Sequence, residues 1–154
     1  MIAILQRVLS SSVTIDGATC GATRRGLLVL LGVAAGDTED DAVLLADKIS
    51  RLRIFEDDNG KMNLSVTDVG GEVLVVPNFT LLASCRKGNR PDFFASAHPD
   101  VARPLFEKFC ELMSERTVKV ERGVFGADMK VSLVNDGPVT IHLDTNVLKG
   151  SRRG

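Results

Sequence analysis

Short apolar runs, several of them alternating with polar residues, cover much of the N-terminal part of the chain and are typical of β-strands. Residues 2–8 and 13–16 alternate and are separated by serines, so we expect two strands there. Gly17 and Gly21 punctuate a further short hairpin segment. Residues 27–33 are apolar throughout, which predicts a strand that is buried on both faces.

Two longer segments repeat apolar residues at helical spacing. Residues 38–53 are predicted to form an amphipathic helix that begins at Thr38, a typical N-cap residue, with carboxylates in its first turn. Residues 99–116 predict a second helix, in which Pro104 is tolerated only close to the start. The repeating apolar positions are Leu45, Ile49 and Leu52 in the first helix and Val101, Leu105, Phe109 and Leu112 in the second.

The remaining strand-like segments lie in the second half of the chain. Residues 72–82 are densely apolar, but Pro77 cannot donate to a ladder, so this strand lies at a sheet edge, is bulged, or ends there. The other segments are residues 117–120, 130–134 and 139–143. The last two flank Asn135-Asp136-Gly137-Pro138. An ordinary hairpin turn is the simpler interpretation of that tetrapeptide, and a rigid backbone wedge beside a pocket is the functional one.

Strands outnumber helices and do not alternate regularly with them. This pattern predicts an α/β domain in which two main helices lie on antiparallel or mixed sheets. The chain has 154 residues, the length of one domain. We assign residues 1–148 to that domain and residues 149–154 to a flexible basic tail.

Charge and composition narrow the classes of partner. The net charge is −1, so a nucleic acid would have to be held by a local patch rather than by an overall field. Arg86, Lys87 and Arg90 supply such a patch in the loop at residues 85–91, although a merely solvated loop has the same composition. No apolar run reaches the length of a membrane span, and the N-terminus does not resemble a signal peptide, so we expect a cytoplasmic protein.

Metal and disulfide chemistry have little support in the sequence. Cys20, Cys85 and Cys110 are widely spaced and form no C-x-x-C pair, and the only histidines are His98 and His142. We therefore expect no metal and no other cofactor, and we interpret both histidines as structural.

Thr80 lies towards the end of the densely apolar segment and is a candidate site residue. Backbone N–H groups beside a strand-breaking proline are free to stabilise an oxyanion, whereas Thr80 itself is a weak nucleophile without a neighbouring base. Phe125 and Met129 are candidates to line a pocket, with core packing as the alternative. The residues by themselves predict an α/β domain with a candidate pocket and no more.

Six motifs occur in order from residue 1 to about residue 145. They are MIAILQRV at residues 1–8, GLLVLLGV at 26–33, RIF at 53–55, GKMNL at 60–64, NFTL at 78–81 and VSLVNDGPVT at 131–140. Each motif is modest alone, but the ordered set is specific, and it resembles the D-aminoacyl-tRNA deacylase family.

The resemblance implies a hydrolase that acts on tRNA. Such an enzyme cleaves the ester that joins a D-amino acid, or glycine mischarged on tRNA(Ala), to the terminal ribose. The resemblance also implies a cytosolic homodimer with a three-layer α/β/β fold and an active site at the subunit interface. It implies no cofactor and no membrane partner.

The family's Gly-cis-Pro motif matches Gly137-Pro138. By that match, the carbonyls of this wedge enter the partner subunit's pocket and capture the α-amino group of the substrate. An L side chain would collide with the wedge, whereas glycine would escape the collision. Arg7 matches a family arginine that holds the motif in place.

The family's second motif, Ser-Gln-x-Thr, reads Pro77-Asn78-Phe79-Thr80 here. Pro77 lacks an N–H group and Asn78 is one methylene shorter than glutamine, so a related deacylase with an altered substrate preference is an alternative. We expect the N–H groups near Phe79 and Thr80 to stabilise the oxyanion, Thr80 to position the substrate, and the ribose 2′-hydroxyl to assist proton transfer. The expected tRNA-binding residues are Arg86, Lys87 and Arg90, with Lys149, Arg152 and Arg153 as additions.

Two other classes of function stay open at this point. One is an RNA-binding or small-molecule-binding module without catalysis. The other is a different hydrolase that uses Cys85 or His142. Neither alternative explains the ordered set of motifs.

Overall fold

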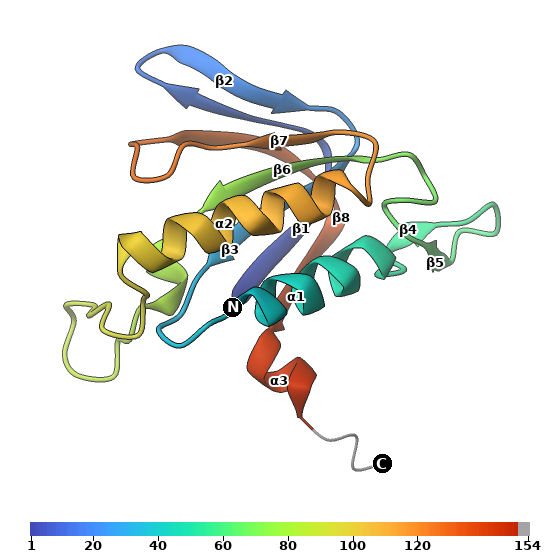
Figure 1. Ribbon diagram of the computed structural model, residues 1–154. Helices are drawn as coiled ribbons and strands as arrows, with labels where there is room; N and C mark the ends of the chain where they lie inside the picture. The colour runs from blue at the N-terminus through green and yellow to red at the C-terminus, as the bar shows by residue number, and fades with distance from the viewer. Residues whose placement is uncertain (151–154) are drawn as a thin grey trace.

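A mixed β-sheet with helices on one face forms the body of the protein (Figure 1). The structure is a computed structural model that describes residues 1–150. The strands are β1 (Ile2–Ile15), β2 (Ala18–Thr23), β3 (Gly26–Gly32), β4 (Phe55–Glu56), β5 (Met62–Leu64), β6 (Glu72–Pro77), β7 (Val120–Arg122) and β8 (Lys130–Asp144). The helices are α1 (Glu39–Arg51), α2 (Pro99–Ser114) and α3 (Thr145–Lys149), with a 3₁₀ turn, η1, at Phe79–Leu82.

The order of the main sheet is β2-β1-β3-β6-β7, with β8 also paired to β1. β1 is antiparallel to β2, β3 and β8, whereas β3–β6 and β6–β7 are parallel pairs. The sheet curls until its two ends approach each other, and Lys119 Nζ beside β7 donates a hydrogen bond of 3.2 Å to the carbonyl of Ala22 in β2. The mixed α/β class is therefore confirmed, with a sheet that is nearly a barrel.

β1 is one continuous strand, so the predicted break at the serines is wrong. Ser11 and Ser12 pair with β2 on one side and with β8 on the other. The buried hydroxyl of Ser11 lies 2.5 Å from Thr23 Oγ1, so its hydrogen-bonding need is met across the strands. A buried polar side chain is tolerated in a strand when a partner of this kind is available.

β8 is also continuous, and the hairpin-turn interpretation of residues 135–138 is wrong. Both halves of β8 run antiparallel to the same strand, β1. Gln6 pairs with Thr140 and Val8 with Asn135, so two steps along β1 correspond to five steps along β8. The four residues between these pairs, 136–139, lie opposite Arg7 alone, so they bulge out of the ladder and carry the Gly137-Pro138 dipeptide. We call them the β8 bulge.

β6 ends at Pro77, which was one of the three options for this proline. The expected strand over residues 78–82 is instead the turn η1. The ladder with β3 continues for one more bond, from the N–H of Asn78 to the carbonyl of Leu31 at 2.8 Å. The ring of Pro77 faces Gly123, just beyond the end of β7, where no ladder bond needs the missing N–H group.

Both predicted long helices are present, and they pack against each other over one face of the sheet (Figure 1). Thr38 caps α1, and its N–H group donates a bond of 2.9 Å to the carboxylate of Asp41. α2 begins at Pro99, as expected, and ends at Ser114. Residues 117–120 were expected to be a strand, but β7 begins only at Val120.

Two apolar clusters fill the two faces of the sheet. The alternation along each strand divides its residues between them, because successive side chains point to opposite faces. Leu27, Val29 and Leu31 of β3 belong to the cluster under the helices. Leu28 belongs to the cluster inside the curled sheet, together with Val8, Val13, Leu74 and Val76.

The C-terminal helix α3 is fastened to the start of the chain and to α1. The Met1 amino group donates to Thr145 Oγ1 at 2.6 Å. Lys149 Nζ lies 2.6 Å from the buried carboxylate of Asp41. Lys149 is the last residue of α3, whereas residues 151–154 of the expected tail lie outside the described residues.

At Gly26 the backbone of β3 packs directly against the backbone of β6 at Glu72. A Cβ atom there would lie 1.8 Å from the carbonyl oxygen of Glu72. We expect Gly26→Ala to lower the free energy of unfolding by about 3 kcal/mol or more, measured by urea denaturation. Gly36→Ala is the matched control: φ is also positive there, but nothing lies within 4 Å, so the cost is about 1–2 kcal/mol. Equal losses would contradict this account of the β3–β6 contact.

The Asp41 carboxylate contributes to the free energy of unfolding, and its contribution depends on pH. Burial raises the pKa of this carboxyl, but the hydrogen bonds from Lys149, the Thr38 N–H and Thr145 outweigh it and hold the pKa well below the ordinary value of 3.8. A lowered pKa in the folded state gives stability above the unfolded pKa and loses it as the pH falls. We therefore expect Asp41→Asn to destabilise the protein at pH 7, with a gap to the wild type that narrows from about pH 5 to about pH 3 in urea titrations. The exposed neighbour Asp40→Asn is the control. A gap independent of pH would contradict the prediction.

Candidate active site

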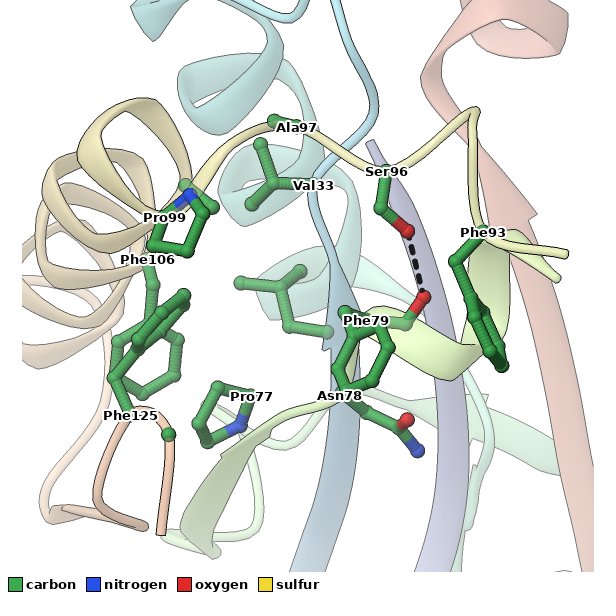
Figure 2. A pocket seen from close by; sticks show the side chains of 13 residues that line it. Val33, Pro77, Asn78, Phe79, Phe93, Ser96, Ala97, Pro99, Phe106 and Phe125 are labelled. Carbon is green, nitrogen blue, oxygen red and sulfur yellow. Dashed lines mark hydrogen bonds between the residues drawn. The ribbon is translucent and has the colours of Figure 1, made fainter.

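A cavity of about 420 Å³ opens where β3 and β6 end, beside the N-terminus of α2. The carboxyl ends of neighbouring parallel strands are the usual place for a ligand site in α/β proteins. The lining residues are Leu31, Val33, Pro77, Asn78, Phe79, Phe93, Ser96, Ala97, Pro99, Ala102, Phe106, Phe125 and Gly126. Figure 2 shows Phe106 and Phe125 on one side of the cavity and Phe79 on the other.

Four aromatic rings line the cavity. Phe79 and Phe93 meet edge to face with their centroids 5.1 Å apart, and Phe106 and Phe125 are tilted with centroids 6.3 Å apart. Asn78 and Ser96 bring the only polar side chains among the lining residues, and none of these residues is titratable. The cavity therefore suits a flat or apolar group but cannot supply an acid, a base or a nucleophile from its own side chains.

The turn η1 places one free N–H group at the cavity. Asn78 Oδ1 accepts the N–H of Thr80 at 3.2 Å and also the hydroxyl of Thr80. The N–H of Phe79 has no acceptor among residues 1–150. Of the two N–H groups that the sequence proposed for an oxyanion, only that of Phe79 is thus available. Thr80 is exposed and does not line the cavity, and its hydroxyl is bonded to an amide, not to a base.

The loop before α2 fixes the other side of the cavity. Ser96 Oγ donates to the carbonyl of Phe79 at 3.0 Å, which ties this loop to η1 (Figure 2). The N–H of Ala97 donates to Val33 beyond the end of β3 at 2.9 Å. Sequence reasoning did not find this part of the wall. Its residues before α2 lie in a segment without strand or helix periodicity, and Phe106 has the pattern of an ordinary core residue of α2.

The predicted wedge lies outside this chain's own cavity. Gly137 and Pro138 are exposed in the β8 bulge, their peptide bond is cis, and neither residue lines the cavity. Arg7 holds the bulge from beneath, donating to the Asp136 carbonyl at 3.0 Å and lying 3.3 Å from its carboxylate. The same guanidinium donates to the carbonyl of Ile54 at 2.8 Å. Within one chain, therefore, the structure brings Arg7 to the bulge but does not bring the bulge to Phe79.

Phe125 and Met129 separate in the structure. Phe125 lines the cavity. Met129 is not among the lining residues and packs with the cluster inside the curled sheet. Its sulfur lies so close to Gly123 that a Cβ atom there would be 2.6 Å away. Met129 thus contacts the core, which was the alternative interpretation of this residue.

The proposed RNA-binding side chains are exposed. Arg86, Lys87 and Arg90 occupy a loop whose ends are joined by two hydrogen bonds between Ser84 and Asp92, of 2.9 and 3.0 Å. Lys149 differs from them because it is paired with Asp41. The other two proposed residues, Arg152 and Arg153, lie outside the described part of the chain.

The remaining chemical candidates are dispersed. His98 caps α2, with its ring nitrogen 3.3 Å from the N–H of Asp100, and His142 is exposed on β8. Cys85 is exposed, whereas burial raises the pKa of the Cys110 thiol to about 12. Among residues 1–150, no group of three or more His, Cys, Asp or Glu side chains is arranged to hold a metal ion. Within the same range, no helix is both long and apolar enough to cross a membrane.

Comparison with solved structures extends the description of the fold. A structure named "c-Myc DNA Unwinding Element Binding Protein" superposes with a TM-score of 0.88 at 41% identity, over 94% of this chain and 98% of that one. A second, named "Structural Analysis of a probable eukaryotic D-amino acid tRNA deacylase", has a TM-score of 0.80 at 16% identity, over 92% and 97%. At that identity, the second likeness concerns the fold alone.

Comparison of the sequence identifies the family. Two curated relatives, both named D-aminoacyl-tRNA deacylase, come from Anaeromyxobacter dehalogenans and Thermotoga petrophila. They are 59% and 56% identical over 148 residues, which is 96% of this chain and 99% of each relative. The family model described as D-Tyr-tRNA(Tyr) deacylase matches residues 4–144, so this chain belongs to that family of deacylases.

Proposed function

We propose that this protein hydrolyses the ester between a D-amino acid and the terminal ribose of tRNA, releasing the free amino acid and the tRNA. The match to the deacylase family over residues 4–144 carries this proposal. The cavity supports it, because an apolar space that includes the free N–H group of Phe79 suits an aminoacylated nucleoside rather than a metal or a charged cofactor. Cytoplasmic location remains a prediction from the sequence.

The chemistry we propose uses the main chain and the substrate. Water attacks the ester carbonyl, and the N–H of Phe79 stabilises the oxyanion that develops. The bond between the acyl carbon and the ribose oxygen then breaks, and a proton of the attacking water passes to that leaving oxygen with the help of the neighbouring 2′-hydroxyl. The lack of any titratable group among the residues that line the cavity supports this division of work.

Selection between enantiomers is proposed to require a second copy of the chain. Gly137 and Pro138 in the β8 bulge are exposed, while Arg7 binds the preceding Asp136 carbonyl from below, so the carbonyls of Gly137 and Pro138 are available to another molecule. We propose that the bulge of one subunit enters the cavity of the other and binds the substrate α-amino group. An L side chain would then collide with Gly137 and Pro138, while glycine would fit, which adds glycyl-tRNA(Ala) to the substrates.

Pro77 and Asn78 are the basis of an alternative substrate preference. Both line the cavity, and Asn78 Oδ1 is already occupied by Thr80. The Asn78 amide is shorter than the glutamine of the family motif, and Pro77 replaces its serine, so both change the part of the wall that we propose faces the acyl group.

A second alternative is a nucleic-acid-binding module without catalysis. The solved structure at 41% identity supports it, because that protein is named for binding a DNA element. The release of free amino acid distinguishes the non-catalytic module from the main proposal, and a comparison of release rates between different aminoacyl-tRNAs distinguishes the altered preference.

Enantiomer selectivity and the β8 bulge are tested together. We expect the wild type to release D-amino acids from tRNA faster than L-amino acids by about 10²-fold or more. A Cβ at position 137 would lie 2.7 Å from the Val139 side chain and 3.3 Å from the Arg7 guanidinium, so Gly137→Ala would displace the bulge. It should lower kcat/KM for the D-substrate by about tenfold or more.

Gly60→Ala is the matched control, since φ is also positive at Gly60 and no atom lies within 4 Å of its Cβ position. The melting temperature of each variant separates lost activity from lost fold. Equal release of both enantiomers by the wild type would end the proposal of chiral selection. Binding of aminoacyl-tRNA without release of amino acid would support the non-catalytic alternative.

The source of proton transfer is tested with a 2′-deoxy substrate. We expect its hydrolysis to be slower by about 10²-fold or more, because the assisting hydroxyl is missing.

The role of Thr80 is tested by substitution. Thr80→Ala should lower kcat with D-aminoacyl-tRNA by only about fivefold, the effect of one lost hydrogen bond. Thr80→Ser retains the hydroxyl and serves as the control. An undiminished rate with the 2′-deoxy substrate would discard substrate assistance, and complete loss in Thr80→Ala with a trapped acyl-enzyme in the wild type would make Thr80 the nucleophile.

A further inference from the structure

A second hollow, of about 270 Å³, lies directly beside the cavity. The two hollows share Phe106 and Phe125, which stand between them as a common wall. The polar side chains of the second hollow are Arg103 and Glu107 from α2 and Arg122 from the end of β7. We call it the arginine groove. Neither the motifs nor the proposed chemistry uses it.

The two guanidiniums of the arginine groove have no carboxylate partner. Arg103 lies over the ring of Phe125, 5.3 Å from its centroid, which holds one charge against the common wall. Among residues 1–150, neither Arg103 nor Arg122 forms an ion pair, whereas Arg7 and Arg116 each do. Glu107 lines the same groove one helical turn after Arg103 but pairs with neither arginine. The groove thus has an excess of positive charge that no ion pair within residues 1–150 neutralises.

An aminoacylated RNA end has a matching layout. The acyl group is esterified to the last ribose, and the nearest phosphate is attached to the 5′ oxygen of that same ribose. One nucleoside therefore separates the ester from the first phosphate, just as one aromatic wall separates the cavity from the arginine groove. Arginine recognises phosphate by charge-assisted hydrogen bonds.

We propose that the arginine groove binds the phosphodiester that precedes the terminal nucleoside of the aminoacyl-tRNA, through Arg103 and Arg122. This inference rests on the proposed function, because it needs the acyl ester to occupy the neighbouring cavity. Phe125 then has two roles: it lines the cavity and it carries Arg103 on its other side. The exposed cluster of Arg86, Lys87 and Arg90 remains for more distant phosphates of the same strand.

The test compares two substrates that differ in phosphate. One is a D-aminoacyl-tRNA and the other is the 3′-D-aminoacyl ester of adenosine, which has no phosphate. We expect Arg122→Ala to raise KM for the tRNA about tenfold more than KM for the adenosine ester. Arg122→Lys keeps the charge and should recover most of the loss. Arg24→Ala is the control, since Arg24 is exposed before the start of β3, at the end opposite to the cavity.

Salt dependence supplies an independent measurement. For the tRNA substrate, log kcat/KM is plotted against the logarithm of the salt concentration. The slope should be shallower by about 0.7 in Arg122→Ala and also in Arg103→Ala, because each variant loses one phosphate contact. Equal losses on both substrates, or an unchanged salt slope, would overturn the phosphate site. Wild-type failure to hydrolyse the adenosine ester and the tRNA alike would instead count against the proposed function, so the two failures can be told apart.

Discussion

The parallel pairing of β3 with β6 is the contact on which the rest of the structure depends. It requires the chains to approach at Gly26, where a side chain would overlap the backbone of β6. It also aligns the ends of the two strands, so that Leu31 lies opposite Pro77. Because proline stops β6 there and β7 has already ended, no further strand covers the space beyond, and the cavity opens at that edge.

The cavity explains why a search for catalytic side chains finds none. Apart from Asn78 and Ser96, its wall is aromatic and aliphatic. The Cys110 thiol lies outside the cavity, and burial raises its pKa far from the neutral range. Such a wall excludes water from bound groups and strengthens the few polar contacts that remain, because the local dielectric constant is low. A single main-chain N–H can then matter more than it would in solvent. On the proposed function, the reactive groups are those of water and of the substrate itself.

Arg7 differs from Arg103 and Arg122 in its burial and in its hydrogen-bond partners. Arg7 is 5% exposed and is bonded to Ile54 and Asp136, so it acts as a fixed support for the β8 bulge. Arg103 and Arg122 are exposed and unpaired within the described residues. A net charge of −1 conceals this difference, because the sum says nothing about which cations lack a neighbouring anion. Local groups of unpaired arginines are the places where an anionic partner gains most.

Local patterns in the sequence determined the helices, most of the strands and the identity of several site residues. Helix 38–53 and strand 27–33 were predictable, because their spacing and end residues act over a few positions. Asn78 and Phe79 were predicted as site residues from a short motif, Phe125 was a candidate pocket residue, and all three line the cavity. The continuity of β1 and β8 was not predictable, since serines and a Gly-Pro dipeptide normally interrupt strands. Their polar groups are satisfied by residues that are distant in the sequence, Thr23 for Ser11 and Arg7 for Asp136. The aromatic wall, the availability of the Phe79 N–H and the arginine groove likewise depend on contacts between distant segments, and only the tertiary structure decides these.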